Sequence, residues 1–427
     1  MKSKKSLAAI AVISLFASSV WATNGYAPHG IGQKSKGMGG VGIALVQDTV
    51  GGGMNPAGMV GLGNRLDVGL EWFRPIRSTE FVGNTMIDGF DLPSYYDGSD
   101  AKNFFIPEFG YNHMINERMA LGVSVFGTGG MNTRYANGIP FFNQGGNVTG
   151  IDLMQLFVVP SLSWKINDRH SIGIGLNLAA QLFNAKGLQN FDAPAGVPQQ
   201  MSESPGNVTN NGYDASYGAG IRFGWIGQIS DMVTLGATYQ SRTYMSEFDD
   251  YKGLFAEQGD FDIPENFGAG IAVQATPKLL LAFDIMRINY NSVEAIGNSI
   301  SRLFLGSPLG SNNGPGFAWE DQTVYKLGIS YELNPDWTLR AGWNHGDNPI
   351  PNNETFFNTL APGVVENHLT LGATWNLGNG QEVTFTYMHA FENEVKGSAS
   401  IPPDFGGGEA NIKMYQNSIG ISWGRML

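Results

Sequence analysis

Residues 171–182 read SIGIGLNLAAQL, a stretch in which aliphatic side chains alternate with small or polar ones. A period of two indicates a β-strand, because successive side chains of a strand point to opposite faces. The same alternation recurs in residues 337–345 and 418–423. One face of each predicted strand is therefore apolar, and the other is small or polar. The aliphatic members of the first stretch are Ile172, Ile174, Leu176, Leu178 and Leu182.

Charged residues of the predicted strands fall, by the same parity, on the face that carries the small residues. A soluble β-sandwich shows the opposite arrangement, with bulky side chains between its sheets and charges outside. A membrane barrel turns aliphatic side chains toward lipid and polar ones toward its lumen. The pattern therefore favours an all-β transmembrane barrel over a secreted soluble β-protein. The charged residues assigned to the inner face are Glu108, Lys165, Arg222, Asp284, Lys326, Glu332 and Arg340.

The composition is also typical of an exported barrel. Glycine accounts for 59 of 427 residues, aromatic residues for 12% and charged residues for only 15%. Cysteine is absent, which excludes disulfides and thiolate nucleophiles, and the net charge of −12 argues against nucleic acid as a partner. Residues 1–22 are predicted to be a secretory signal peptide, because lysines precede the apolar run 7–16 and Ala22 ends a small-x-small cleavage site. Beyond it, no apolar run is long enough to cross a bilayer as a helix.

Short segments rich in Asn, Asp, Pro and Gly predict tight turns between strands. They are residues 115–118, 166–169, 229–232, 275–278, 333–336 and 377–380. Fourteen antiparallel strands are predicted around them, an even number that fits a bacterial barrel with both ends in the periplasm. The predicted strands are residues 64–80, 102–115, 118–135, 149–166, 169–189, 214–229, 231–248, 263–276, 278–292, 321–334, 336–347, 365–377, 381–397 and 412–426.

Residues 23–63 show neither the apolar stripe of a helix nor the alternation of a strand, and they are crowded with glycine. A fourteen-stranded barrel is wide enough to hold a lumen, and an open lumen would leak small solutes. This segment is the one unassigned stretch long enough to fill such a lumen. We therefore predict a signal peptide at 1–22, an N-terminal hatch (plug) inside the lumen at 23–63, and the barrel at 64–427.

Three blocks of sequence resemble the long-chain fatty-acid transporter family of Gram-negative outer membranes (FadL-like, including its aromatic-hydrocarbon relatives). The first contains Asn55-Pro56-Ala57, which is similar to the Asn-Pro-Ala motif of the family's hatch. The second leads through the first tight turn into a glycine-rich strand, and the third spans residues 319–397. The quoted motifs are Gly37-Met38-Gly39-Gly40, Asp48, Pro107-Glu108-Phe109, Gly127-Thr128-Gly129-Gly130-Met131, Trp337-Thr338-Leu339-Arg340-Ala341-Gly342, Asp347-Asn348-Pro349-Ile350-Pro351 and Tyr387-Met388-His389.

The resemblance implies that hydrophobic ligands are caught outside, pass to an internal pocket and leave sideways through the wall at a kink in the third strand. Gly127, Gly129 and Gly130 would form this kink, since glycines permit a bulge that breaks ladder hydrogen bonds. Simple curvature of the strand is the alternative. Asn55, Pro56 and Ala57 are candidate gate residues, expected where the hatch approaches the first strand.

Two further groups of residues are candidates for binding the ligand. Phe141, Phe142, Leu254 and Phe255 are apolar residues on predicted outer loops, where they would flank an exposed capture groove. The alternative is that they pack against one another or against the hatch. Family members that bind fatty acids use basic side chains near the carboxylate, but this sequence does not match them residue by residue. Lys186, Arg222, Lys326 and Arg340 are the candidates, with pairing to lumen acids or hatch backbone as the alternative.

The predicted function is passive uptake of long-chain fatty acids or aromatic hydrocarbons across the Gram-negative outer membrane. A non-specific diffusion porin and a structural or adhesive barrel are the alternatives. Neither a cofactor nor a metal site is predicted, because the histidines are scattered and cysteine is absent. Catalytic residues are not predicted either, so the protein is not expected to be an enzyme. The expected partners are a hydrophobic small molecule, membrane lipid and lipopolysaccharide, with no nucleic acid, and the resemblance favours a monomer.

Overall fold

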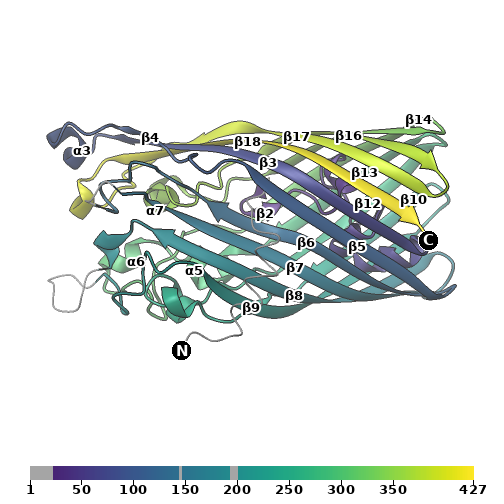
Figure 1. Cartoon of the computed structure of the whole chain (residues 1–427), viewed down its shortest axis with the longest axis horizontal. Helices are drawn as coiled ribbons and strands as arrows, with labels where there is room; N and C mark the ends of the chain where they lie inside the picture. The colour runs from purple at the N-terminus through teal and green to yellow at the C-terminus, as the bar shows by residue number, and fades with distance from the viewer. Residues whose placement is uncertain (1–22, 144–146, 193–200) are drawn as a thin grey trace.

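A computed structural model describes residues 23–143, 147–192 and 201–427. In these residues, fourteen long antiparallel strands form one closed sheet, so the predicted fold class is confirmed (Figure 1). Each strand pairs with its neighbour along the chain, and the last pairs with the first, where Ile419 lies opposite Trp72. The strands are β3 (Arg65–Val82), β5 (Phe104–Asn116), β6 (Met119–Asn132), β7 (Gly150–Lys165), β8 (His170–Lys186), β9 (Asp214–Gln228), β10 (Val233–Gln240), β12 (Asn266–Thr276), β13 (Leu279–Ile288), β14 (Gln322–Asn334), β15 (Trp337–Gly346), β16 (Asn367–Gly378), β17 (Gln381–Val395) and β18 (Glu409–Met426).

All six predicted tight turns connect consecutive strands at one end of the barrel, where the C-terminus also lies (Figure 1). The long loops gather at the other end and carry short elements that alternation in the sequence does not reveal. These are β4 (Tyr95–Asp97), α3 (Thr85–Gly89), α4 (Ala256–Gly259), α5 (Glu294–Gly297), α6 (Ser301–Phe304), α7 (Thr355–Asn358), η3 (Gln189–Phe191), η4 (Asp249–Tyr251), η5 (Tyr290–Ser292), η6 (Asn352–Glu354) and η7 (Pro403–Phe405). No helix in the described part of the chain is long and apolar enough to cross a membrane.

The predicted strand 231–248 is interrupted by a bulge near its outer end. β10 ends at Gln240, which lies opposite Arg222 of β9, and the short strand β11 (Tyr244–Met245) resumes the same antiparallel pairing one residue out of register, with Tyr244 opposite Ala219. Glycine in β9 leaves room for the segment, because a Cβ at Gly218 would lie 2.2 Å from the carbonyl oxygen of Tyr244.

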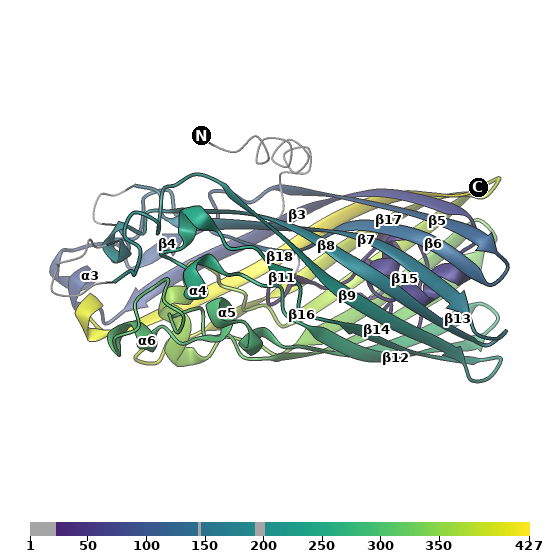
Figure 2. The same ribbon diagram turned by 90° about the horizontal axis from the view of Figure 1, so that it is seen from below.

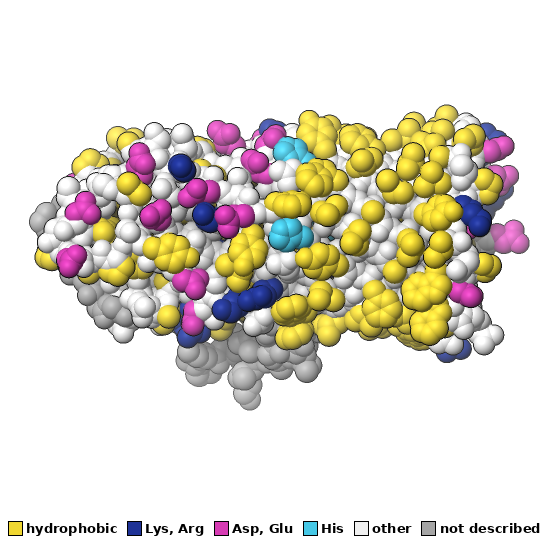
Figure 3. All heavy atoms as spheres, turned by 90° about the horizontal axis from the view of Figure 1, so that it is seen from above, with side chains coloured by type: hydrophobic (Ala, Val, Ile, Leu, Met, Phe, Trp, Pro, Cys, Tyr) yellow, Lys and Arg dark blue, Asp and Glu magenta, His cyan; other side chains and the backbone are white. Residues whose placement is uncertain are grey.

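Aliphatic and aromatic side chains cover the outside of the barrel near the turn end. Leu70, Ile174 and Leu371 are exposed there, as the alternation predicts. Figure 3 shows one face, on which hydrophobic side chains fill the half toward the right, whereas acidic and basic side chains gather on the left and at the right-hand end. At the turn end, Trp337 and Trp375 stack with ring centroids 5.8 Å apart. An apolar band with aromatic residues at its border is the surface of a lipid-embedded barrel.

Residues 23–63, the N-terminal segment, lie inside the barrel toward the turn end (Figure 2). The segment contains β1 (Thr23–Asn24), β2 (Ala27–Pro28), α2 (Gln33–Lys36), η1 (Val50–Gly53) and η2 (Pro56–Gly61). Glycines of the wall allow it to approach the strands. A Cβ at Gly342 would lie 2.1 Å from the amide nitrogen of Gly39, and one at Gly224 would lie 1.9 Å from Oδ1 of Asn55. The small residues on the inner face thus make room for the segment.

Candidate functional site

Buried ion pairs tie the N-terminal segment to the wall. Nζ of Lys36 lies 2.5 Å from Oε2 of Glu71 and 3.6 Å from Oε2 of Glu108. Nζ of Lys34 lies 2.5 Å from Oε1 of Glu382. Burial by itself would lower the pKa of Lys36, but Glu71 and Glu108 outweigh burial and raise it. The acids on the inner face therefore hold the cations of the segment in place.

The predicted gate residues sit at a second attachment point, which is not the expected one. Oδ1 of Asn55 accepts a hydrogen bond from the amide of Ala57 at 3.0 Å and so caps η2, while Pro56 occupies its first position. Nδ2 of Asn55 donates to the carbonyl oxygens of Ile43 at 2.7 Å and Trp225 at 3.1 Å. Trp225 belongs to β9, so the tripeptide packs far along the wall from the first strand, β3. The expected location beside β3 was wrong, because a segment that lies inside the lumen can cross it and contact any strand of the wall.

The predicted kink in the third strand coincides with a β-bulge. The pairing of β6 with β7 shifts between Gly127 and Gly129, which leaves Thr128 without a partner in that ladder. A Cβ at Gly129 would lie 2.6 Å from the carbonyl oxygen of Tyr26, and the amide of Gly130 donates to the same oxygen at 3.3 Å. The bulge therefore brings β6 against the start of the N-terminal segment.

On its other side, β6 separates from β5. The described pairing between them ends where Phe109 lies opposite Val125. Toward the loop end, β5 continues to Phe104 and β6 to Asn132 without pairing to each other. The outer part of the wall at this position therefore lacks the ladder hydrogen bonds that close the rest of the barrel.

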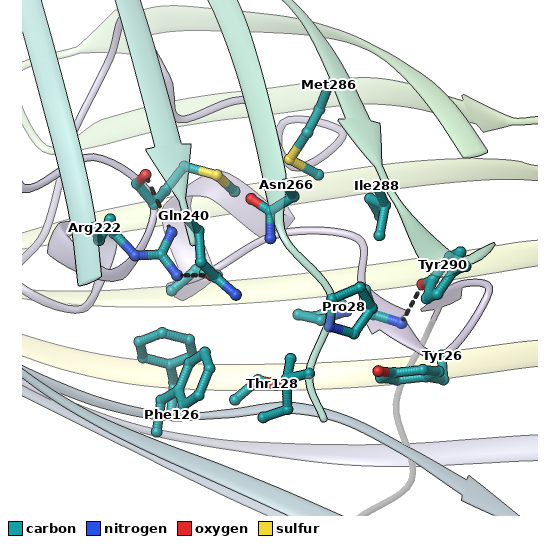
Figure 4. A pocket seen from close by; sticks show the side chains of 16 residues that line it. Tyr26, Pro28, Phe126, Thr128, Arg222, Gln240, Asn266, Met286, Ile288 and Tyr290 are labelled. Carbon is teal, nitrogen blue, oxygen red and sulfur yellow. Dashed lines mark hydrogen bonds between the residues drawn. The ribbon is translucent and has the colours of Figure 1, made fainter. Parts of the chain in front are cut away.

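A cavity of about 550 Å³, part of it open to solvent, lies beside the bulge and is here called the central cavity. Its walls come from the bulged strand, the N-terminal segment and the strands opposite. Most of the lining is apolar, and Figure 4 shows Arg222 and Gln240 on one side with Tyr26 and Tyr290 on the other. Among the lining residues are Tyr26, Pro28, Phe126, Thr128, Arg222 and Tyr290.

Arg222 is the predicted basic residue that reaches the central cavity. It donates to Oε1 of Gln240, to Oδ1 of Asn177 at 3.4 Å and, as the alternative expected, to backbone of the N-terminal segment, the carbonyl oxygen of Met54, at 3.5 Å. Within the described residues no carboxylate lies within ion-pair distance of it, although Arg222 is 3% exposed. A buried guanidinium without an acidic partner is costly unless something else compensates its charge.

The other three predicted basic residues lie elsewhere. Nζ of Lys326 donates to the carbonyl oxygen of Gly40 at 3.3 Å, and Nε of Arg340 donates to Oε1 of Gln47 at 3.3 Å. Both therefore hold the N-terminal segment, as the alternative reading expected. Lys186 is exposed, and its position in β8 is on the same outward face as Ile174. Successive residues of a strand point to opposite faces of the wall, so Lys186 points away from the lumen and cannot meet a ligand there.

The four predicted capture residues do not flank an exposed groove. Phe141, Phe142, Leu254 and Phe255 are all buried. Aromatic side chains from several loops pack over the mouth of the barrel: Phe142 lies 5.2 Å from Phe356 between ring centroids. The expectation of exposure was wrong because rings that are far apart in sequence exclude water together. Leu254 and Phe255 do line a second cavity of about 290 Å³, here called the loop cavity.

A series of aromatic rings connects the loop cavity with the central cavity. Phe255 lies 4.8 Å from Phe261, Phe261 lies 6.4 Å from Tyr26, and Tyr26 lies 5.3 Å from Tyr290, all between ring centroids. Tyr26 also lines a smaller cavity of about 290 Å³ together with Gly130 of the kink. The sequence reasoning missed Tyr26 and Phe261, because they lie in the N-terminal segment and in a loop, where no periodicity marks them. It missed Tyr290 because the predicted strand 278–292 included this residue, whereas β13 ends at Ile288. For Tyr26 and Phe261, the one available signal was an aromatic residue outside the predicted strands.

The comparisons with known proteins agree with this architecture. A family model described as outer membrane protein transport protein (OMPP1/FadL/TodX) matches residues 37–406. No curated protein matches the sequence.

Three solved structures show the same fold. A FadL homologue from Pseudomonas aeruginosa has 16% identity and a TM-score of 0.69, with 94% of this chain and 99% of that one covered. The toluene transporter TodX from Pseudomonas putida has 17% identity and a TM-score of 0.68, covering 95% and 100%. The toluene transporter TbuX from Ralstonia pickettii has 18% identity and a TM-score of 0.62, covering 93% and 98%. With a family match over most of its length and a closed fourteen-stranded barrel, the chain belongs to the outer membrane protein transport protein (OMPP1/FadL/TodX) family of Gram-negative outer membranes.

Proposed function

We propose that this protein takes up hydrophobic small molecules passively across the outer membrane, with residues 23–63 acting as a hatch. The observation that carries the proposal is the central cavity, which is largely apolar and lies beside the unpaired stretch of wall between β5 and β6. Solved structures with the same fold are described as toluene transporters and as a FadL homologue, which supports a hydrophobic ligand.

The route begins at the loops and ends in the lipid. A ligand enters through the loop cavity beside Leu254 and Phe255, moves along the aromatic rings to the central cavity, and leaves through the wall at the β6 bulge. An apolar solute gains free energy by avoiding water at every step, at about 25 cal/mol per Å² of apolar surface kept from water. Lateral exit into the membrane is therefore favoured over exit through the hatch into the aqueous periplasm.

The polar side of the central cavity favours a long-chain carboxylate over a plain hydrocarbon. Arg222 is buried with neutral partners, Gln240 and Asn177, so a ligand carboxylate would supply the missing negative charge. The alkyl chain would lie against Phe126 and Phe157 on the apolar side. A charge-assisted hydrogen bond in a low-dielectric site is about twice as strong as a neutral one.

Deleting Thr128 tests the exit. The deletion lets β6 pair with β7 without a register shift, so the bulge is lost and the wall should close. We expect uptake of labelled oleate and of toluene by whole cells to fall at least about tenfold, while the surface level of the protein stays normal. Thr128→Ala, which keeps the bulge, is the matched control and should transport normally. Unchanged uptake of both compounds by the deletion variant would refute lateral exit.

A diffusion porin is the competing function, and the filled lumen argues against it. The segment occupies the lumen and is bonded to the wall by Lys36 and Asn55. Planar-bilayer recordings separate the two functions, since a porin gives steady ion conductance and a hatched transporter does not.

A further inference from the structure

The unpaired stretch of wall between β5 and β6 is here called the window. Toward the turn end it is bounded by the last pair of the two strands, Phe109 opposite Val125. Residues 104–108 of β5 pair with β3 alone, and Pro107 among them has no backbone N–H to offer to β6. On the far edge of the window, β6 pairs with β7 as far as Asn132.

The window is closed again toward the loop end by a different part of the chain. β4 pairs with the outer part of β3 and lies beside it (Figure 1). The chain then reaches the end of β6, where Ser99 forms a parallel bridge with Arg134 and the amide of Arg134 donates to the carbonyl oxygen of Gly98 at 2.9 Å. Residues 98–101, here called the bridging segment, therefore take the place of β5 between β3 and β6.

Arg77 of β3 fastens the bridging segment to both sides of the window. Its Nη1 donates to the carbonyl oxygen of Pro75 at 2.8 Å, and its Nη2 donates to the carbonyl oxygen of Ala101 and to Oδ1 of Asn132, both at 2.8 Å. The amide of Arg77 donates to Oγ of Ser99 at 2.7 Å, and that hydroxyl donates back to the carbonyl oxygen of Arg77 at 2.8 Å. One residue thus joins β3, the bridging segment and β6.

The guanidinium of Arg77 is completely buried, and its partners are neutral. Arg77 is 0% exposed and forms no ion pair in the part of the chain that the structure describes. Because burying a cation is costly, such a group is weak evidence for a role in stability. What the guanidinium adds is a defined arrangement, since oxygen atoms from three separate segments must converge on it.

Asn132, the partner on β6, stands between an inner cavity and the outer surface of the wall. On the inside it lines the smaller cavity of about 290 Å³ that Tyr26 and Gly130 also line. On the outside it lines a pocket of about 420 Å³ together with Ala101 and the exposed Lys186. The contact between Asn132 and the guanidinium therefore closes the wall at the place where the inner cavity meets the outer end of the window.

We propose that Arg77 is a positioning residue that closes the outer end of the window and so limits the size of the ligand that leaves through it. This inference rests on the lateral exit proposed above and adds the residue that sets the length of the opening. Without the guanidinium, the bridging segment loses the contact that fixes it to Asn132, and the window can extend toward the loops. Toluene passes in either case, whereas a polycyclic hydrocarbon needs the longer opening.

Distances across the window test the structural part of the proposal. The chain has no cysteine, so Phe105→Cys and Lys186→Cys introduce two unique sites for spin labels. Phe105 is exposed on β5, and Lys186 reports the position of β6 because β6, β7 and β8 pair in series. In purified protein carrying Arg77→Met, the distance distribution should broaden and shift to longer distances. Arg74→Met, the matched control, removes a partly buried arginine of the same strand and should leave the distribution unchanged.

The selectivity of uptake tests the functional part. The measured quantity is the ratio of pyrene uptake to toluene uptake by whole cells, after subtracting the uptake of cells that lack the protein. Arg77→Met should raise this ratio at least about fivefold, as expected for the loss of hydrogen bonds from a charged group. Arg74→Met should stay within about twofold of the original protein. Arg77→Lys keeps a cation that can donate to Asn132 and should give an intermediate ratio. If Arg77 only held the fold together, uptake of both compounds would fall together and the ratio would not change.

Asn132→Leu removes the same contact from the side of β6 and should reproduce both effects, so the test does not depend on the folding of Arg77→Met. Heat-modifiable migration on gels verifies that each variant is folded. The proposal is overturned if the folded variants match Arg74→Met in the distance distribution or in the uptake ratio. A Thr128 deletion that lowers uptake, combined with an unchanged ratio in Arg77→Met, would refute the role of Arg77 and leave lateral exit intact.

Discussion

Replacing Lys36 with methionine should release the N-terminal segment from the lumen. The ammonium group lies 2.5 Å from Glu71 and 3.6 Å from Glu108, and each of the three side chains is only 3–4% exposed. Removing the cation leaves two buried carboxylates facing each other without compensation. Breaking a buried ion pair by removing one partner costs about 3–5 kcal/mol. The barrel itself should stay folded, because its ladder hydrogen bonds do not involve this side chain.

The expected effect on the equilibrium follows from that energy. At about 1.4 kcal/mol per factor of ten, the docked state loses about two to four orders of magnitude in its equilibrium constant. Amide hydrogen exchange in α2, where the amide of Gly37 donates to the carbonyl oxygen of Gln33, should accelerate by the same factor. Ion conductance through single barrels in planar bilayers should rise in parallel.

Two further variants make this prediction sharp. Lys413→Met removes a partly exposed lysine that lies 3.5 Å from Glu392, and such a surface pair contributes at most about 1 kcal/mol, so exchange in α2 should not change. Adding Glu71→Gln and Glu108→Gln to Lys36→Met removes the uncompensated charges and should restore much of the protection. If exchange in residues 23–63 and conductance both stay at their original values in Lys36→Met, the reasoning about this ion pair is refuted.

Two other predictions concern the ligand and pH. Arg222→Met should weaken oleate binding in calorimetric titrations by about tenfold or more and leave toluene binding unchanged, since only a carboxylate pairs with the positive charge. If the variant and the original protein bind oleate with equal affinity, the ligand is a hydrocarbon and not a carboxylate. Burial, with smaller contributions from Lys36 and Lys326, lowers the pKa of His29 from 6.5 to about 3. Because the folded pKa is depressed, the stabilisation from neutral His29 is complete above pH 6.5 and is lost as the pH falls toward 3. The protection factors in the segment, corrected for the intrinsic exchange rate at each pH, should therefore fall by up to about tenfold per pH unit below 6.5. His29→Gln should remove this component in exchange measurements at pH 7, 6 and 5, and an identical pH dependence in both proteins would contradict the assignment.

Much of the candidate site was beyond what residue patterns could predict. Gly127, Gly129 and Gly130 were recognisable because glycine in a strand signals a bulge or a close approach, and the structure shows both at this place. Arg222 could not be distinguished from Lys326 and Arg340, since all three share the inward parity. What separates them is the set of partners: Lys326 and Arg340 bond to Gly40 and Gln47 of the N-terminal segment, whereas Arg222 bonds to side chains of neighbouring strands and lines the central cavity. These partners are far apart in the sequence, so no local pattern reveals them.

The amino-acid sequence by itself determined the barrel: its strand number, its lipid-facing surface and the end that carries the tight turns. These follow from local rules, since alternation along a strand and the turn chemistry of residues such as 333–336 need no knowledge of distant segments. Only the tertiary structure decided that Asn55 anchors at β9, that β5 and β6 part beyond Val125, and that Phe141 and Phe255 are buried. Each of these depends on contacts between residues far apart in the chain. Such contacts form only when the closed barrel brings distant segments together, so no local pattern predicts them.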